Sequence, residues 1–199
     1  MSQFTGIFGI IAGILSFSAY IFYIFAILRG ETKPSRATWF IWAVIGIILA
    51  FSYRASGAED TVWVAVSEAI APTIIALLAI KYGVGGTDKT DVLSFVGSLF
   101  SLVLWYIFDS AVVALVTNLA IDFFAALPTI KKTWTNPEHE DRFAWILTQT
   151  GNLINLFAID KPIFAVIIYP AYTFIIDGII TGLLFRKKKY DSGIVYKSE

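Results

Sequence analysis

Hydrophobic residues fall into long, nearly unbroken blocks along the chain, and not at the spacing of three to four residues that marks an amphipathic helix. Charged residues, glycine, proline or serine separate seven such blocks, at 5–28, 38–55, 61–82, 91–108, 110–130, 142–159 and 162–185. Most of the blocks reach the ~20 residues that a helix needs to cross the hydrocarbon core of a bilayer. The pattern predicts an all-α membrane protein with seven transmembrane helices.

The amino-acid composition supports a chain that is surrounded by lipid. Hydrophobic residues make up 57% of it, charged residues only 15%, and the mean hydropathy is +0.74, whereas about a quarter of a soluble domain is charged. The net charge of zero gives no indication of nucleic-acid binding, and no nucleic-acid partner is expected. The first block lacks a basic stretch before it and a small-residue cleavage site, so we expect a retained helix and not a signal peptide.

The residues that most often bind metals are scarce. The chain has no cysteine, and its single histidine, His139, lies in a hydrophilic stretch. This excludes disulfides and thiolate chemistry. We therefore expect neither a metal nor a cofactor, and we do not expect an enzyme, because an intramembrane hydrolase needs a nucleophile with its base or a metal cluster.

The distribution of positive charge predicts the orientation in the membrane. Seven crossings place 13 of the 15 lysines and arginines on one side, and leave only Arg54 and Lys161 on the other. Basic residues favour the cytoplasmic side of a membrane. The N-terminus is therefore predicted outside and the C-terminus in the cytoplasm.

The chain also contains an internal repeat. A shift of 103 positions, which superimposes Pro34 on Pro137, aligns five further pairs: Ile27 with Ile130, Arg29 with Lys132, Thr32 with Thr135, Phe40 with Phe143 and Trp42 with Trp145. We interpret residues 1–82 and 110–185 as two three-helix repeats, 83–109 as a loop and linker helix 4, and 186–199 as a basic cytoplasmic tail. Because the linker adds one crossing, the two repeats run parallel, about an axis along the membrane normal.

Several polar side chains are predicted at membrane depth, where they usually face a cavity or a partner. Three carboxyl groups are candidates for coupling to protons: Asp122, Asp177 and Glu68. Candidate solute-binding residues are the amides and aromatics near them: Asn118, Asn152, Asn155, Gln149, Trp42, Trp145 and Tyr169. The alternative interpretation is that these groups hydrogen-bond between helices and stabilise the bundle, at roughly 1 kcal/mol each.

Two prolines are predicted inside helices, Pro72 in the third block and Pro170 in the seventh. A proline within a helix lacks an amide donor and frees the carbonyl one turn earlier. Because the two prolines occupy matching places in the repeats, they are candidate hinges for a rocking motion. The alternative is a static kink that fits the neighbouring helices.

Two stretches resemble known families. Residues 127–137 (LPTIKKTWTNP) resemble the signature of PQ-loop proteins, with Thr129 in the place of the glutamine, and residues 32–42 (TKPSRATWFIW) resemble a bacterial group of seven-helix proteins of unassigned function. The three-plus-one-plus-three layout is similar to that of the SWEET sugar transporters. The resemblance implies a multi-pass protein of the bacterial plasma (inner) membrane.

These observations together predict a transporter for a small polar metabolite, such as a sugar, an amino acid or a vitamin precursor, bound between the two repeats. A non-retinal seven-helix receptor or sensor, or a structural membrane protein, is the alternative. A retinal pigment is disfavoured, because the last block has no lysine at its centre to form a Schiff base. The expected partners are the lipid bilayer and the solute, and association into a homo-oligomer is left open.

Overall fold

The computed structural model describes residues 3–86, 88–89, 91–93, 96, 107 and 111–186. Within these residues the chain forms six α-helices and one short 3-10 helix: α1 (Gln3–Leu28), α2 (Arg36–Ala55), α3 (Val62–Tyr82), α5 (Ala111–Thr135), η1 (Pro137–His139), α6 (Arg142–Leu156) and α7 (Phe164–Leu184). The predicted fourth segment, 91–108, and the predicted tail, 186–199, lie almost wholly outside the described residues. The prediction of an all-helical protein is confirmed for the part that is described.

Four of the described helices, α1, α2, α3 and α7, are long and apolar enough to cross a membrane. The helix α6 has only 15 residues, about 22 Å at 1.5 Å per residue, which is less than the ~30 Å of a hydrocarbon core. The helix α5 has 25 residues, but its sequence includes Asp122, Lys131 and Lys132. A membrane-compatible helical bundle is thus present, whereas the seven crossings and their orientation remain predictions.

The end of α5 differs from the prediction. The predicted apolar block ends at residue 130, but α5 continues through Lys131 and Lys132 to Thr135. Pro128 lies inside the helix and does not end it. Two threonines stabilise the last turns, since Thr133 Oγ1 donates to Thr129 O at 2.8 Å and Thr135 Oγ1 donates to Lys131 O at 3.1 Å.

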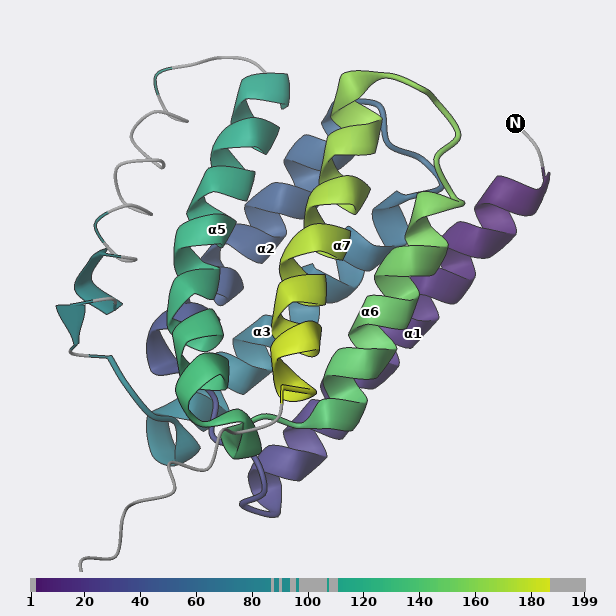
Figure 1. Ribbon diagram of the computed structural model, residues 1–199. Coiled ribbons are helices and arrows are strands. Elements are labelled where there is room, and N and C mark those ends of the chain that lie inside the picture. The colour runs from purple at the N-terminus through teal and green to yellow at the C-terminus, as the bar shows by residue number, and fades with distance from the viewer. Residues whose placement is uncertain are drawn as a thin grey trace, which may run out of the picture.

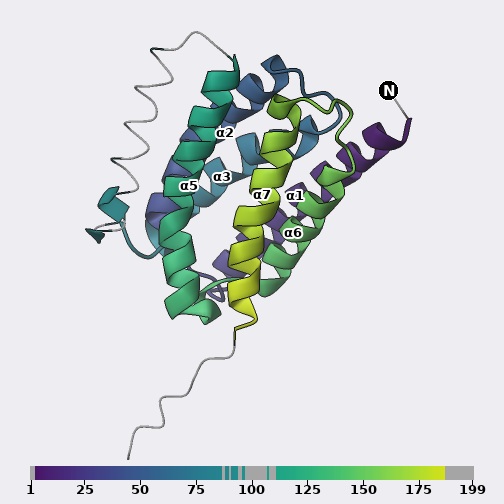
Figure 2. The same cartoon turned by 45° about the horizontal axis from the view of Figure 1, so that its top comes forward.

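The six helices form a closed ring (Figure 1). The first three pack in the order α1–α3–α2, the last three in the equivalent order α5–α7–α6, and the ring closes where α1 contacts α6 and α2 contacts α5. Figure 2 shows the same two layers, with α5, α7 and α6 in front of α2, α3 and α1. In chain order, α1 and α5 are the first helices of their layers, and α2 and α6 are the second. Each closing contact therefore joins the first helix of one layer to the second helix of the other. Two copies of one three-helix unit would pack in this way, and the internal repeat itself remains a prediction.

The two ends of the ring differ in charge. At the end where α1, α3, α5 and α7 finish and α2 and α6 begin, hereafter the basic end, lie Arg29, Lys33, Lys131, Lys132 and Arg142. At the opposite end, the α2–α3 and α6–α7 loops are joined by Lys161, whose Nζ lies 2.7 Å from Glu59 Oε1 and 3.2 Å from Gly57 O. The hydrogen bond from Lys161 lowers the pKa of Glu59 below its ordinary value of 4.5. The contribution of this pair to stability is therefore lost as the pH falls through that lowered pKa.

The two predicted hinge prolines, Pro72 in α3 and Pro170 in α7, lie inside their helices. By the i to i−4 pattern of a helix, they free the carbonyl groups of Glu68 and Val166. The Val166 carbonyl accepts a hydrogen bond of 2.8 Å from the Tyr53 hydroxyl of α2. The Glu68 carbonyl lies against Gly46, also of α2, where a Cβ would stand 2.1 Å from the oxygen. Both freed carbonyls thus face the same helix.

Replacing Tyr53 by phenylalanine should lower the free energy of unfolding by about 1–3 kcal/mol, because a buried carbonyl would lose its partner. Tyr53 is fully buried, and its hydroxyl oxygen also lies within hydrogen-bond distance of Thr61 Oγ1, at 2.7 Å. Chemical unfolding in detergent measures the change. Tyr82→Phe in α3 is the control, since the Tyr82 hydroxyl has no hydrogen-bond partner within the described ranges. Equal shifts in the two variants would contradict the assignment.

Candidate functional site

A cavity lies inside the ring, and all six helices contribute to its wall. It has about 660 Å³ of empty space, a figure that includes space open to solvent. On α2 the lining residues run from Trp39 to Leu49, and on α6 from Ala144 to Thr148. Both helices begin at the basic end, so the cavity extends from mid-bundle toward that end.

Aromatic side chains form much of the cavity wall. They come from four helices: Tyr20, Tyr23, Trp39, Trp42, Trp145 and Tyr172. The rings of Trp39 and Trp42 meet edge-on, with centroids 5.0 Å apart and an interplanar angle of 89°. Two pairs of polar aromatics, Tyr20/Tyr23 and Trp39/Trp42, have a spacing of three, which puts both members on one helix face. This spacing is a signal in the sequence that could have predicted these two parts of the cavity wall.

Three carboxyl groups line the cavity, and each accepts a hydrogen bond from a neutral donor. The pairs are Tyr169 Oη to Glu68 Oε2 at 2.8 Å, Tyr172 Oη to Asp122 Oδ2 at 2.7 Å, and Asn152 Nδ2 to Asp177 Oδ2 at 2.8 Å. Among the described residues no lysine, arginine or histidine lines the cavity, and none forms an ion pair with these carboxyl groups. The described protein therefore provides no positive charge to balance them.

The structure brings part of the predicted site together. The three carboxyl groups, the two predicted tryptophans and one predicted hinge line the cavity: Glu68, Asp122, Asp177, Trp42, Trp145 and Pro72. The tyrosine and two of the amides lie behind the wall, where they hold other groups: Tyr169 and Asn152 bond cavity carboxyl groups, and Asn118 Nδ2 donates to Ser52 Oγ at 3.2 Å.

The remaining predicted residues also lie outside the cavity wall. Gln149 Nε2 donates to Phe174 O at 3.2 Å. Asn155 is fully buried, and neither its side-chain nitrogen nor its oxygen has a hydrogen-bond partner in the described part of the chain. Pro170 is buried in α7.

An apolar cluster fills the ring between the cavity and the opposite end. Its largest members are Leu49, Tyr53, Leu115, Leu119 and Tyr169. The rings of Tyr53 and Tyr169 pack with centroids 4.6 Å apart. This packing explains why Asn118 is not on the cavity wall, although it shares a helix face with Asp122: it lies one turn nearer the opposite end, where the ring is already filled.

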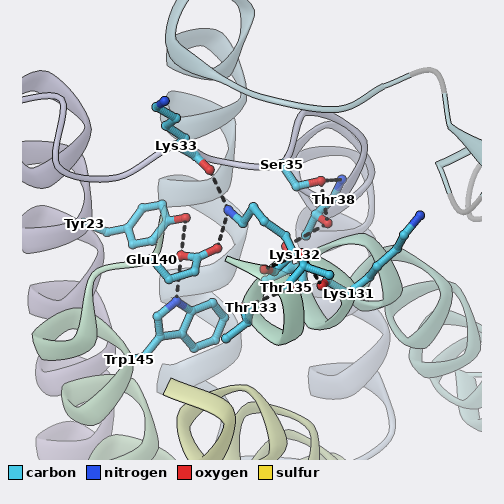
Figure 3. Close-up of polar contacts among 11 residues, drawn as sticks. Tyr23, Lys33, Ser35, Thr38, Lys131, Lys132, Thr133, Thr135, Glu140 and Trp145 are labelled. Carbon is cyan, nitrogen blue, oxygen red and sulfur yellow. Dashed lines mark hydrogen bonds and ion pairs between the residues drawn. The ribbon is translucent and has the colours of Figure 1, made fainter. Parts of the chain in front are cut away.

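A buried ion pair lies on the side of the cavity that faces the basic end (Figure 3). The Glu140 carboxylate pairs with the Lys132 ammonium, and their side chains are only 0% and 9% exposed. Its Oε2 atom also accepts hydrogen bonds from Tyr23 Oη at 2.8 Å and Trp145 Nε1 at 2.9 Å. We call these four residues the Glu140 cluster. Since the rings of Tyr23 and Trp145 line the cavity, Glu140 lies directly behind its wall.

The Glu140 cluster also connects the two halves of the ring. Lys132 Nζ donates to Lys33 O, and the Lys33 backbone amide donates to His139 O at 3.1 Å. Nearby, Thr129 Oγ1 of α5 donates to Thr38 Oγ1 of α2 at 2.9 Å. The loop before α2 thus contacts the loop before α6. Glu140 is not among the predicted site residues, because a glutamate in a hydrophilic stretch ordinarily lies in water.

No known family model matches the chain, and comparison with characterised proteins and with solved structures finds no significant similarity. The resemblance to PQ-loop and SWEET proteins therefore remains an expectation from short motifs and helix layout.

Proposed function

We propose that this protein is a membrane carrier for a small polar solute, which binds in the cavity between the two layers of the ring. The observation that carries the proposal is a space at mid-bundle that holds three carboxyl groups and six aromatic side chains. Ionisable groups at such a depth in a helical bundle are costly and usually mark a solute or ion pathway. A purely structural bundle would gain more from filling that space with apolar side chains.

The packing on the two sides of the cavity supports a carrier in which access alternates between the two ends. Toward the opposite end the ring is filled by close apolar packing around Tyr53 and Tyr169. Toward the basic end, hydrogen bonds and an ion pair around Glu140 hold the helices together. Rocking one layer against the other would open one of these contact regions while the other holds. The bends at Pro72 and Pro170 would absorb the movement, and Asp122, Asp177 or Glu68 would couple it to protons.

Uptake into liposomes tests the proposal. The protein is reconstituted, and a panel of labelled sugars, amino acids and small amines is screened for uptake above that of empty liposomes. For a transported solute we expect Asp122→Asn to reduce uptake by about tenfold or more, since a charge-assisted contact contributes about 1.5–3 kcal/mol. Glu31→Gln is the matched control, because Glu31 is exposed at the basic end and its carboxylate pairs, among the described residues, with Arg29 alone.

The outcome also separates the alternatives. A receptor would bind a solute in the cavity without carrying it across the bilayer, whereas a structural protein would neither bind nor transport one. A carrier would be contradicted if, for every solute of the panel, liposomes with the protein took up no more than empty liposomes.

A further inference from the structure

We infer that the solute of this cavity is a small organic cation, an ammonium group or a positively charged heteroaromatic ring, that also carries an acceptor oxygen. The inference rests on the proposed function of the cavity as a solute site. It is carried by the charge of the lining, by its aromatic walls and by indole donors that are not fully used.

The lining of the cavity carries acidic groups without basic ones. The carboxyl groups of Glu68, Asp122 and Asp177 face one cavity. Their hydrogen-bond donors are hydroxyl and amide groups, which stabilise negative charge without neutralising it. Buried charge of one sign needs a partner of the other sign. The partner is therefore a proton or a bound cation, and the ionised cavity favours a cation over an anion.

A nearby lysine does not serve as that partner. The Lys132 side chain is 9% exposed, and it is engaged with Glu140 behind the rings of Tyr23 and Trp145. Its ammonium also donates to the Lys33 carbonyl. The charge of Lys132 is thus used on the far side of the wall.

The aromatic lining of the cavity also favours a bound cation. A cation placed over a Trp or Tyr face gains about 0.5–2 kcal/mol, more when it is desolvated. Trp39 is central here, because its ring contacts both Trp42, at 5.0 Å and 89°, and Tyr20, at 6.1 Å and 78° between the ring planes. Walls at such angles offer ring faces from more than one direction. A neutral sugar could stack on them too, but it would leave the three carboxyl groups unbalanced.

The cavity wall also contains indole donors that are not fully used. Trp39 is 2% exposed and lies in the cavity wall, yet its indole N–H makes no hydrogen bond of ordinary geometry in the described part of the chain, although the Tyr23 hydroxyl lies nearby. The indole N–H of Trp42 likewise makes none among the described residues, although it lies near the Asp122 carboxyl group. A buried donor without a partner is costly, so a solute that offers a hydroxyl or carbonyl oxygen would satisfy it. Together the groups select a cation with an oxygen nearby.

Protons and the cation compete for the same carboxyl groups. Four helices contribute titratable side chains to the cavity: Tyr20 and Tyr23 of α1, Glu68 of α3, Asp122 of α5, and Tyr172 and Asp177 of α7. Among the described residues, α2 and α6 contribute none. Behind the wall, Glu140 and Lys132 neutralise each other. A cation that enters a protonated cavity therefore displaces protons, which makes proton exchange the natural coupling.

The test compares cations with neutral molecules of similar shape. The protein in nanodiscs is titrated with two such pairs: choline with its neutral carbon isostere 3,3-dimethyl-1-butanol, and the N-methylnicotinamide cation with nicotinamide. Ethanolamine is added as a further cation and glucose as a neutral sugar. Tryptophan fluorescence reports binding, since Trp39, Trp42 and Trp145 line the cavity. We expect at least one cation to bind about tenfold or more tightly than its neutral counterpart, and its affinity to fall as the pH is lowered.

Variants make the site assignment specific. Asp122→Asn and Asp177→Asn should each weaken cation binding by about tenfold or more and reduce its pH dependence, while Glu31→Gln leaves both unchanged. Size-exclusion profiles and melting temperatures show whether each variant is folded. If one of the two carboxyl variants does not fold, the other still tests the site. Binding of glucose or of the neutral isosteres in preference to every cation would overturn the inference and leave the carrier proposal standing. Binding of no molecule in the set would overturn both.

Discussion

Methionine in place of Lys132 should lower the free energy of unfolding by about 3–5 kcal/mol, because the Glu140 carboxylate would stay buried without its counter-charge. The Glu140 side chain is 0% exposed and the Lys132 side chain 9% exposed. The two hydrogen bonds from Tyr23 and Trp145 would remain, but neither carries charge. Denaturant unfolding of the purified protein in detergent measures the loss.

The neighbouring lysine provides a matched control. Lys131 pairs with Asp88, but these side chains are 50% and 51% exposed, and an exposed pair contributes only about 0–1 kcal/mol. Lys131→Met should therefore change stability little. The double variant Lys132→Met/Glu140→Gln should recover part of the loss, because it removes the unbalanced charge. Similar losses in the two single lysine variants would show that the ion pair behind the cavity wall is not what stabilises the basic end.

Alanine in place of Gly46 should lower the free energy of unfolding by about 3 kcal/mol or more, since overpacking at a rigid contact displaces whole helices. The added Cβ would stand 2.1 Å from the Glu68 carbonyl oxygen, 3.0 Å from its carbon and 3.3 Å from Ala69 Cα. All three atoms belong to the α3 backbone, so no side chain can rotate away. The oxygen is the one freed by Pro72, and the clash would therefore act on the bend of α3.

A second helical glycine is the control for this variant. Gly182 lies in α7, and a Cβ there would meet nothing within 4 Å in the described structure. Gly182→Ala should be neutral or stabilise the protein by about 0.5–1 kcal/mol through the helix propensity of alanine. We expect Gly46→Ala also to weaken solute binding, because Glu68 lines the cavity beside that contact. A stable Gly46→Ala protein with normal binding would show that α2 and α3 do not need this close approach.

The positions of the described helices could be predicted from the lengths of the apolar blocks. A chain in lipid has to satisfy its backbone hydrogen bonds within each segment. A long apolar block is therefore expected to form a helix. The bounds of α2 (Arg36–Ala55) and α3 (Val62–Tyr82) lie within two residues of the predicted 38–55 and 61–82. The three carboxyl groups and the two tryptophans predicted for the site do share one cavity, because their helix faces all point to the centre of the ring.

The amide side chains could not be placed from the sequence. Helical spacing predicts which face a residue occupies, but not the level at which neighbouring side chains fill the bundle. Asn118 and Asp122 share a face, yet Asn118 is 1% exposed and bonded to Ser52 beside the apolar cluster. The same limit applies to Asn155, which no described side chain satisfies.

The Glu140 cluster depends on contacts between distant parts of the chain. Tyr23 is 117 positions from Glu140, and no local pattern links the two. The glutamate stands in a hydrophilic stretch, where a single sequence predicts a solvated charge. Its burial follows only from the way in which the end of α5, the start of α6 and α1 meet at the basic end.

The ring of helices has a consequence for how such a protein could arise. Each three-helix layer presents the edge of its first helix to the second helix of the other, and the two closing contacts are equivalent. A three-helix ancestor with both edges could have closed the same ring as a symmetric dimer, since a two-fold interface requires only that one surface complement its own copy. Fusion of two such genes would then have needed a connection that returned the chain to its starting side, after which the cavity residues of the two halves were free to diverge.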